Sequence, residues 1–331
     1  FIKKTYPNIR LRRLRATKSI RKLVKETTLS SHDLIQPIFL VEGKSKKEKI
    51  KTMPGIFRYS IDNALKEIKY LEKYGIGAIA LFPQIDKKFK DNEASESFNP
   101  DGLIQRAIRQ IKNKFPNITI ISDVALDPYT SHGQDGIISK NKKVLNDMTI
   151  DVLVRQALSH AESGVDIVAP SDMMDGRVKK IRQAFENKNF HDTIILSYSA
   201  KYSSNFYGPF RDAIGSAKAL GKADKNTYQL DYSNISDAIR EVDMDISEGA
   251  DIVMIKPGIP YLDIVSKVKE VTKVPIFVYQ VSGEYSMIKA ASQKGWLNER
   301  SIVMETLACI KRSGASAIIT YYAKDVLKWM K

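Results

Sequence analysis

Short runs of apolar, mostly β-branched residues alternate along this chain with longer segments of helical periodicity. The runs lie at 36–41, 76–82, 118–124, 165–170, 193–199, 251–256, 275–280 and 317–322. Runs so nearly continuous are typical of parallel strands covered on both faces. Eight strand–helix units predict an α/β fold, a closed TIM-type (β/α)₈ barrel, with an open doubly wound sheet as the alternative. No Gly-rich dinucleotide or phosphate loop follows the first run, which disfavours the open sheet.

The polar segments between the runs support the same fold. Segment 62–75 is amphipathic, with Leu65, Ile68 and Leu71 on the face expected to pack inward. Long polar connections follow the second, third and fifth runs, at 83–100, 127–147 and 200–232. Connections of this length are usually lids or binding loops. All leave the carboxyl ends of strands, where barrel enzymes place their active sites.

The N-terminal segment reads differently from the rest. Residues 1–25 contain ten Lys or Arg and no acidic residue, and the chain carries a net charge of +15. We expect two parts: an arm over 1–30, either disordered or making oligomer contacts with another subunit, and a barrel over 31–331. Elsewhere the lysines are scattered over expected helix surfaces, so we expect no nucleic-acid partner. No apolar run approaches the roughly 20 residues that span a membrane. The single cysteine, Cys309, excludes a multi-cysteine zinc site and weakly favours a reducing, cytosol-like compartment.

Polar residues at the expected strand ends are the candidates for chemistry. They are Asp123, Ser171, Asp172, Ser199, Lys201, Lys256, Ser282 and Tyr321. A lysine with apolar surroundings and a second cation nearby has a lowered pKa. Its neutral amine can then attack a carbonyl group and form a Schiff base. One such lysine suggests an aldolase-type lyase, whereas Lys201 and Lys256 together suggest that two carbonyl compounds are held at once.

The long loops add charged groups to this list. Segment 207–212 combines aromatic residues, a rigid turn and Arg211, as a lid that binds a substrate carboxylate would. Lys225 is a second cation in the same loop, and Ser282 and Tyr321 are hydrogen-bond donors for another carboxylate.

The loop at 123–136 is rich in acidic residues. Asp123, Asp127 and Asp135 either bind a cation or transfer protons, or they only cap turns, and their spacing favours neither interpretation. His132 has no second histidine at metal-ligand spacing, which disfavours zinc.

These motifs resemble the porphobilinogen synthase (δ-aminolevulinate dehydratase) family. The segments that carry the resemblance surround the two lysines, at 197–213 and 253–264, and continue at 279–287 and 123–136. The similarity extends from the RLRRLR segment at 10–15 to the last expected strand.

The resemblance implies a reaction and a role for each matched residue. Two 5-aminolevulinate molecules would condense to porphobilinogen with loss of two waters, an early step of tetrapyrrole (heme and chlorophyll) biosynthesis. Lys256 would bind the first molecule, with Ser282 and Tyr321 on its carboxylate. Lys201 would bind the second, with Arg211 and Lys225 on its carboxylate. Lys225 stands where many relatives have arginine, so the charge is kept but the planar fork is lost.

The resemblance also implies a metal and an assembly. Ala125, Asp127 and Asp135 occupy the positions of the zinc-binding cysteines of other members, so we expect no active-site zinc. The pattern is that of the magnesium-stimulated, zinc-independent branch, in which Glu241 would lie near an activating Mg²⁺. No organic cofactor is expected. The family implies a homo-octamer, and we expect a bacterial cytosol or a plastid stroma.

Two alternatives remain at this stage. A class I aldolase-type lyase would use one lysine on the same barrel. A basic nucleic-acid-binding protein would use the arm, and its affinity would fall steeply with salt.

Overall fold

The barrel expected from the apolar runs is present in the computed structural model of the chain. The structure describes residues 5–216, 220–221 and 223–330. Within those residues, eight parallel strands form a closed ring in the order β1-β4-β5-β6-β7-β8-β9-β10, and β10 pairs with β1. The ring strands are β1 (Leu34–Val41), β4 (Ala78–Gln84), β5 (Thr119–Val124), β6 (Ile167–Pro170), β7 (Ile194–Lys201), β8 (Ile252–Lys256), β9 (Ile276–Gln280) and β10 (Ala317–Thr320).

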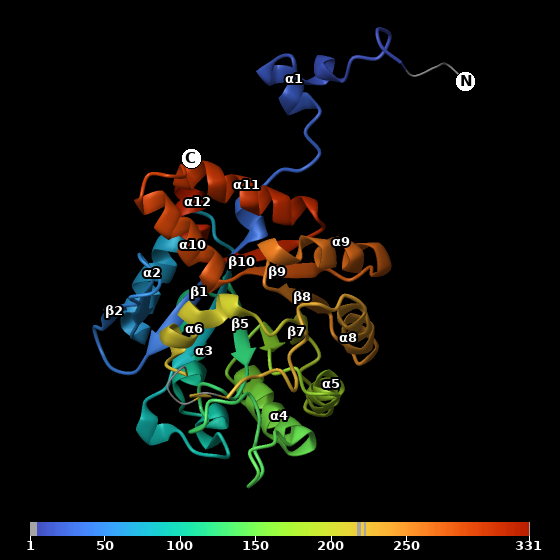
Figure 1. The fold of residues 1–331 in the computed structure, drawn as a ribbon. Coiled ribbons are helices and arrows are strands. Elements are labelled where there is room, and N and C mark those ends of the chain that lie inside the picture. Colours follow the sequence, from blue (N-terminus) through green and yellow to red (C-terminus); the bar gives the residue numbers. More distant parts are fainter. Residues whose placement is uncertain (1–4, 217–219, 222, 331) are drawn as a thin grey trace.

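Helices surround this ring, as Figure 1 shows. The helices are α1 (Lys18–Leu23), α2 (Ile61–Lys73), α3 (Leu103–Lys114), α4 (Asn146–Glu162), α5 (Arg177–Asn187), α6 (Gly208–Ile214), α8 (Ser236–Ser247), α9 (Leu262–Val271), α10 (Ser282–Gln293), α11 (Glu299–Arg312) and α12 (Ala323–Trp329). Short 3₁₀ turns are η1 (Leu11–Arg15), η2 (Ser31–Asp33), η3 (Lys87–Phe89), η4 (Ser95–Phe98), η5 (Asn205–Tyr207) and η6 (Ile259–Tyr261). In α2, Ile68 and Leu71 are buried, and Leu65 is partly buried against the same core.

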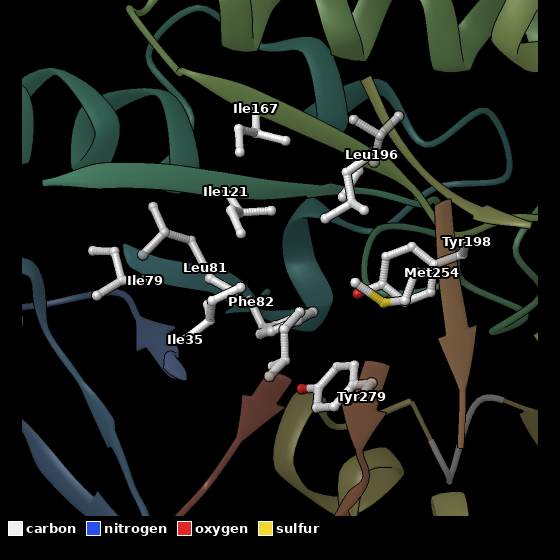
Figure 2. Packing of buried hydrophobic residues seen from close by; sticks show 14 of the residues in the cluster. Ile35, Ile79, Leu81, Phe82, Ile121, Ile167, Leu196, Tyr198, Met254 and Tyr279 are labelled. Carbon is white, nitrogen blue, oxygen red and sulfur yellow. The ribbon is translucent and has the colours of Figure 1, made fainter. Parts of the chain in front are cut away.

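Strand burial explains why the sequence pattern was informative. All residues of β1, β6 and β8 are buried. Buried side chains of neighbouring strands pack together in one hydrophobic cluster, and Figure 2 shows Ile121, Leu196 and Met254 in this cluster. Because both faces of each strand are covered, apolar residues follow one another without alternation.

A small hairpin was not predicted. The strands β2 (Lys47–Lys49) and β3 (Phe57–Tyr59) pair antiparallel, and β3 lies beside the end of β1. Each is three residues long, which is too short to give an alternating pattern.

The arm lies apart from the barrel. Its η1 and α1 contain no buried residue, and Figure 1 shows α1 standing away from the ring of helices. Residues 1–4 of the expected arm, 217–219 and 222 of the 200–232 connection, and 331 of the expected barrel lie outside the described residues.

Candidate active site

A β-bulge brings the two candidate lysines side by side. Ser197 of β7 pairs with Val253 of β8, but three residues further along β7 the pairing has advanced by only two residues on β8. Lys201 therefore stands directly opposite Lys256. Side chains alternate between the faces of a strand, so without the extra residue Lys201 would point outward, as Ser197 does. The strand also runs through Lys201, whereas the sequence pattern placed its end at Ser199.

Lys256 ends β8 in an aromatic pocket. Its side chain is buried, and its Nζ lies 4.7–5.2 Å from the ring centroids of Tyr198, Tyr207, Phe210 and Tyr279. Burial, followed by the charge of Lys201, lowers the pKa of Lys256 to about 7, although nearby aspartates act in the opposite direction. Near neutral pH much of this lysine is thus a free amine, the form that attacks a carbonyl carbon.

Lys201 is equally buried but makes polar contacts. Its Nζ donates a hydrogen bond to the carbonyl oxygen of Ser171, in the loop after β6, and lies 3.6 Å from Oδ1 of Asp135. The amine is therefore directed towards the same cavity as that of Lys256 while remaining within reach of a carboxylate.

Lys225 connects the acidic loop to this pair. Its Nζ lies 3.1 Å from Asp127 Oδ2 and 2.5 Å from Asp135 Oδ2. Burial alone would lower the pKa of Lys225, but these two carboxylates outweigh it and raise it. For the acid Asp135 burial acts in the other direction and would raise the pKa, but the charges of Lys201 and Lys225 bring the pKa of Asp135 down to about 2. Asp135 is thus an anion near neutral pH, and it lies between the Lys201 and Lys225 amines.

Asp123, at the end of β5, has the opposite character. Part of its surface lines the cavity, but Oδ1 is enclosed and has no hydrogen-bond partner among the described residues. Burial raises the pKa of Asp123 to about 7, even though the charges of Lys256 and Lys201 act to lower it. A carboxyl group with this pKa can hold or release a proton near neutrality.

These groups share one small cavity at the carboxyl end of the strands. It has a volume of about 30 Å³, enough for one or a few waters. Its lining residues are Asp123, Asp127, Asp135, Ser171, Lys201, Tyr207, Phe210, Arg211, Lys225, Gln229 and Lys256. The structure thus brings together both lysines, Arg211, Lys225 and all three predicted aspartates.

Ser282 and Tyr321 lie just behind this cavity. Ser282 Oγ accepts a hydrogen bond from the backbone N–H of Phe210 at 2.9 Å. A Cβ on the neighbouring Gly283 would come within 2.5 Å of the Phe206 carbonyl oxygen, so only glycine permits this contact between α10 and the segment that carries α6. The Tyr321 hydroxyl shares a 2.8 Å hydrogen bond with Tyr279, one of the rings around Lys256. Each predicted carboxylate binder is therefore hydrogen-bonded to a residue whose ring packs against the Lys256 amine.

Two other predicted residues are not among those that line the cavity. Asp172 points outward and lies 3.7 Å from the guanidinium of the buried Arg177, which also pairs with Asp245 of α8. Ser199 is buried, and its hydroxyl donates a weak hydrogen bond to the carbonyl of Ser197.

Glu241 lies on α8, outside the barrel. It borders a cavity of about 380 Å³ together with Arg177, Asp175 and Asp237. Burial raises the pKa of Glu241 to about 7, with Arg177 lowering it and Asp245, Asp175 and Asp237 raising it. Across the described ranges, no group of three or more His, Cys, Asp or Glu side chains is arranged to hold a metal ion.

Sequence reasoning missed three residues of the site. Tyr207 and Phe210 were noted only as aromatic residues of a loop, and their contacts with Lys256 carried no local signal. Gln229 lines the cavity, and its Oε1 has no hydrogen-bond partner in the described part of the chain. Nothing around it in the sequence marked it as functional.

Comparisons with known proteins point to a single family. A family model described as delta-aminolevulinic acid dehydratase matches residues 8–329. The chain is 53% identical over 315 residues to the delta-aminolevulinic acid dehydratase of Bradyrhizobium diazoefficiens, covering 95% of this chain and 89% of that protein. It is 52% identical over 323 residues to that of Methanothermus sociabilis, covering 98% and 99%.

A solved structure gives the same result. The delta-aminolevulinic acid dehydratase (porphobilinogen synthase) of Toxoplasma gondii, in complex with the reaction product porphobilinogen, matches with a TM-score of 0.95 and 47% identity, covering 97% of this chain and 91% of that one. No helix among the described residues is long and apolar enough to cross a membrane.

Proposed function

Because this chain belongs to the delta-aminolevulinic acid dehydratase family, we propose that Lys201 and Lys256 each hold one 5-aminolevulinate while the two molecules are joined. The enzyme is a lyase that forms porphobilinogen from two 5-aminolevulinate molecules with release of two waters, an early step of porphyrin biosynthesis. The observation that carries the assignment to these lysines is their direct pairing on adjacent strands, with both amines on one buried cavity.

The first step uses the neutral amine of Lys256. Its nitrogen attacks the ketone carbon of one substrate, and the carbonyl oxygen leaves as water when the imine forms. The lowered pKa supplies the free amine near neutral pH, and the surrounding rings exclude water that would hydrolyse the imine. Ser282 and Tyr321, close behind Lys256, donate hydrogen bonds to the carboxylate of this molecule once their hydroxyls release the Phe206 carbonyl oxygen and the Tyr279 hydroxyl.

The second substrate is held by Lys201 in the same way. Arg211 and Lys225 lie on the same cavity and bind its carboxylate. Because both molecules are tethered, carbon–carbon bond formation becomes an intramolecular event, which can supply roughly 7–11 kcal/mol of the barrier in well-oriented systems. Asp123 accepts or delivers the protons that move during bond formation, and Asp127 and Asp135 keep the cations in place.

Substrate entry requires the segment that carries η5 and α6 to move. A cavity of about 30 Å³ has room for one or a few waters, not for two aminolevulinate molecules. Phe210 and Arg211 of α6 both line it. We assign this segment as the lid.

The decisive assay supplies 5-aminolevulinate and measures the pyrrole product by its colour reaction. We expect product from the unmodified chain, a nearly complete loss in Lys201→Ala and a nearly complete loss in Lys256→Ala. Full activity of Lys201→Ala would instead favour the one-lysine aldolase.

Glu241 is proposed to hold an activating Mg²⁺ through water. Its half-buried carboxylate borders an acidic cavity, and Mg²⁺ commonly keeps several waters while using one or two carboxylates. Activity and thermal stability measured with chelator, with and without added Mg²⁺, test this. Glu241→Gln should abolish any Mg²⁺-dependent rise in melting temperature, and a rise that persists would place the ion elsewhere.

The arm over residues 1–30 is proposed to pack on a neighbouring copy in a homo-octamer. Tyr6, Leu11, Leu14 and Leu23 are exposed in the single chain, and a partner surface would bury them. Light scattering on the full chain and on a version lacking residues 1–30 tests this, because loss of the arm should reduce the mass of the assembly.

We place the enzyme in a reducing compartment, a bacterial cytosol or a plastid stroma. Relatives of both kinds exist, including a chloroplastic delta-aminolevulinic acid dehydratase of Chlamydomonas reinhardtii that is 46% identical. Cell fractionation followed by immunodetection tests the assignment, and recovery in a secreted or envelope fraction would contradict it.

A further inference from the structure

A buried carboxylate lies behind Lys256. Glu284, in the first turn of α10, is 3% exposed. Its Oε2 accepts hydrogen bonds from the backbone N–H groups of Gly258 at 3.1 Å and Val281 at 2.7 Å, and its Oε1 accepts one from Ile259 at 2.5 Å. In the part of the chain that the structure describes, no lysine, arginine or histidine forms an ion pair with it.

Such an arrangement is costly, so it needs a reason. Burying a carboxylate away from cations is unfavourable unless its lone pairs are satisfied. Burial raises the pKa of Glu284 to about 7, and the backbone donors of Ile259, Val281 and Gly258 act to lower it. These hydrogen bonds offset part of the cost of burying the carboxylate. They also fix the loops after β8 and β9 relative to each other.

The loop after β8 begins at Lys256 itself. Gly258 and Ile259 are the second and third residues after the lysine, so Glu284 fixes the chain on its carboxyl side. On the lysine itself, the carbonyl oxygen accepts hydrogen bonds from the Tyr207 hydroxyl at 3.1 Å and the Tyr202 N–H at 3.0 Å. The backbone of Lys256 is therefore held at two points.

The amine of Lys256 has no comparable support. No hydrogen bond of its Nζ is found among the described residues, and it is surrounded by aromatic rings instead. Rings confine an amine without fixing its direction as a hydrogen bond would. The direction of attack must then come from the backbone, and a misplacement of about 1 Å can cost about 100-fold in rate.

Gly258 permits this close approach. A Cβ at that position would lie 3.3 Å from Glu284 Oε1 and 3.2 Å from the Tyr279 carbonyl oxygen. A side chain there would press against both groups, so the glycine and the carboxylate form one tightly fitted unit behind the lysine.

We propose that Glu284 is a positioning residue for Lys256, which aims the amine by clamping the Gly258–Ile259 backbone. The inference rests on the proposed function, since it concerns imine formation at Lys256. Glu284 is not among the residues that line the cavity, so we assign it no direct contact with substrate.

The test compares Glu284→Gln and Glu284→Asp with the unmodified full-length enzyme. Gln keeps the shape, but its amide N–H₂ would face a backbone N–H donor. We expect kcat to fall about 100-fold with KM within about threefold, because orientation rather than binding is lost. Borohydride trapping with aminolevulinate, mapped by peptide mass spectrometry, should show slow labelling of Lys256 and a normal labelling rate of Lys201. Glu284→Asp retains the charge and should recover part of the Lys256 rate.

A matched control is Asp251→Asn. Asp251 also accepts a backbone N–H, from Ile195 at 2.8 Å, but it lies in front of β8, at the other end of the barrel. The Asp251→Asn substitution should lower the melting temperature and leave the labelling rates of Lys201 and Lys256 unchanged.

The outcomes distinguish failure of the positioning role of Glu284 from failure of the proposed function. If Glu284→Gln only lowers the melting temperature while Lys256 is labelled at the normal rate, the positioning role is refuted. If Glu284→Gln does not fold, Glu284→Asp decides by the same criterion. If the unmodified enzyme labels at neither lysine, the proposed function itself fails, whatever the variants do.

Discussion

The two ends of the barrel treat their charged groups in opposite ways. In front of β6, at the amino ends of the strands, Asp166 accepts the N–H of Ile120 at 2.7 Å and pairs with Lys112 at 2.7 Å. In front of β8, Asp251 accepts the N–H of Ile195 and pairs with Arg182 at 2.5 Å. Each carboxylate has both a backbone donor and a cation.

At the carboxyl ends, two charged groups lack such partners among the described residues. Asp123 has a buried oxygen without a described partner, and Lys256 is enclosed by rings. Burial brings the pKa values of both groups to about 7 from opposite sides. The difference teaches that the amino end stabilises the fold, whereas the carboxyl end gives up stability to keep an amine and an acid that can exchange protons.

The largest expected effect comes from removing either lysine at the carboxyl end. Lys256→Ala or Lys201→Ala should lower kcat by about 10⁴-fold or more, because the imine that tethers one substrate can no longer form. Steady-state product formation measures this. Lys112→Ala, at the amino end, is the control and should keep kcat within about twofold. A loss in Lys112→Ala as large as in the other two would abolish the distinction between the ends.

Asp123→Asn should separate activity from stability. Loss of the acid should reduce kcat by roughly 10²- to 10³-fold. The free energy of unfolding should stay within about 1 kcal/mol or rise, because an incompletely satisfied buried carboxyl group is removed. Denaturant titration and steady-state kinetics on the same preparation measure both. A less stable variant with unchanged kcat would assign Asp123 to the fold.

The pH dependence of labelling sharpens the contrast further. Burial moves the pKa of Lys256 down to about 7, so protonation removes the nucleophile below that pH. Initial rates of borohydride trapping at Lys256 should rise about 50-fold from pH 5 to pH 7 and about twofold more before they level off near pH 8. Asp123 titrates in the same range, so the curve describes the pair. A rate that keeps climbing to pH 10 would indicate an ordinary lysine.

The smallest effect is expected at the amino end. Asp166→Asn removes a partly exposed pair with Lys112 and weakens the bond to the Ile120 N–H. It should cost about 1 kcal/mol of unfolding free energy and leave kcat unchanged. Thermal unfolding and product formation test this. A fall in kcat with no loss of stability would contradict the assignment of Asp166 to the fold.

Sequence reasoning predicted the barrel and the lysines for physical reasons. Strands buried on both faces leave continuous apolar runs, and a lysine that ends such a run, as Lys256 does, is conspicuous. Their positions at strand ends also grouped Lys201 with Lys256, and the family resemblance, now supported along residues 8–329, supplied the role expected of each.

The remaining features depend on contacts that no local pattern records. The bulge that turns Lys201 inward follows Ser197 in a stretch without glycine or proline, so nothing marks it. Asp172 was grouped with the site because it follows a strand, yet it faces Arg177 outside the ring. Gln229 and Glu284 come close to the lysine segments only once the strands are closed into a ring, because their neighbours there are distant in the sequence.

The central claim is that both lysines form imines with substrate. The most direct measurement is borohydride reduction of the full chain in the presence of 5-aminolevulinate, followed by peptide mapping. We expect reduced adducts on the peptides that contain Lys201 and Lys256. Labelling confined to one of them at saturating substrate, with full activity after the other is replaced by alanine, would contradict the two-lysine mechanism.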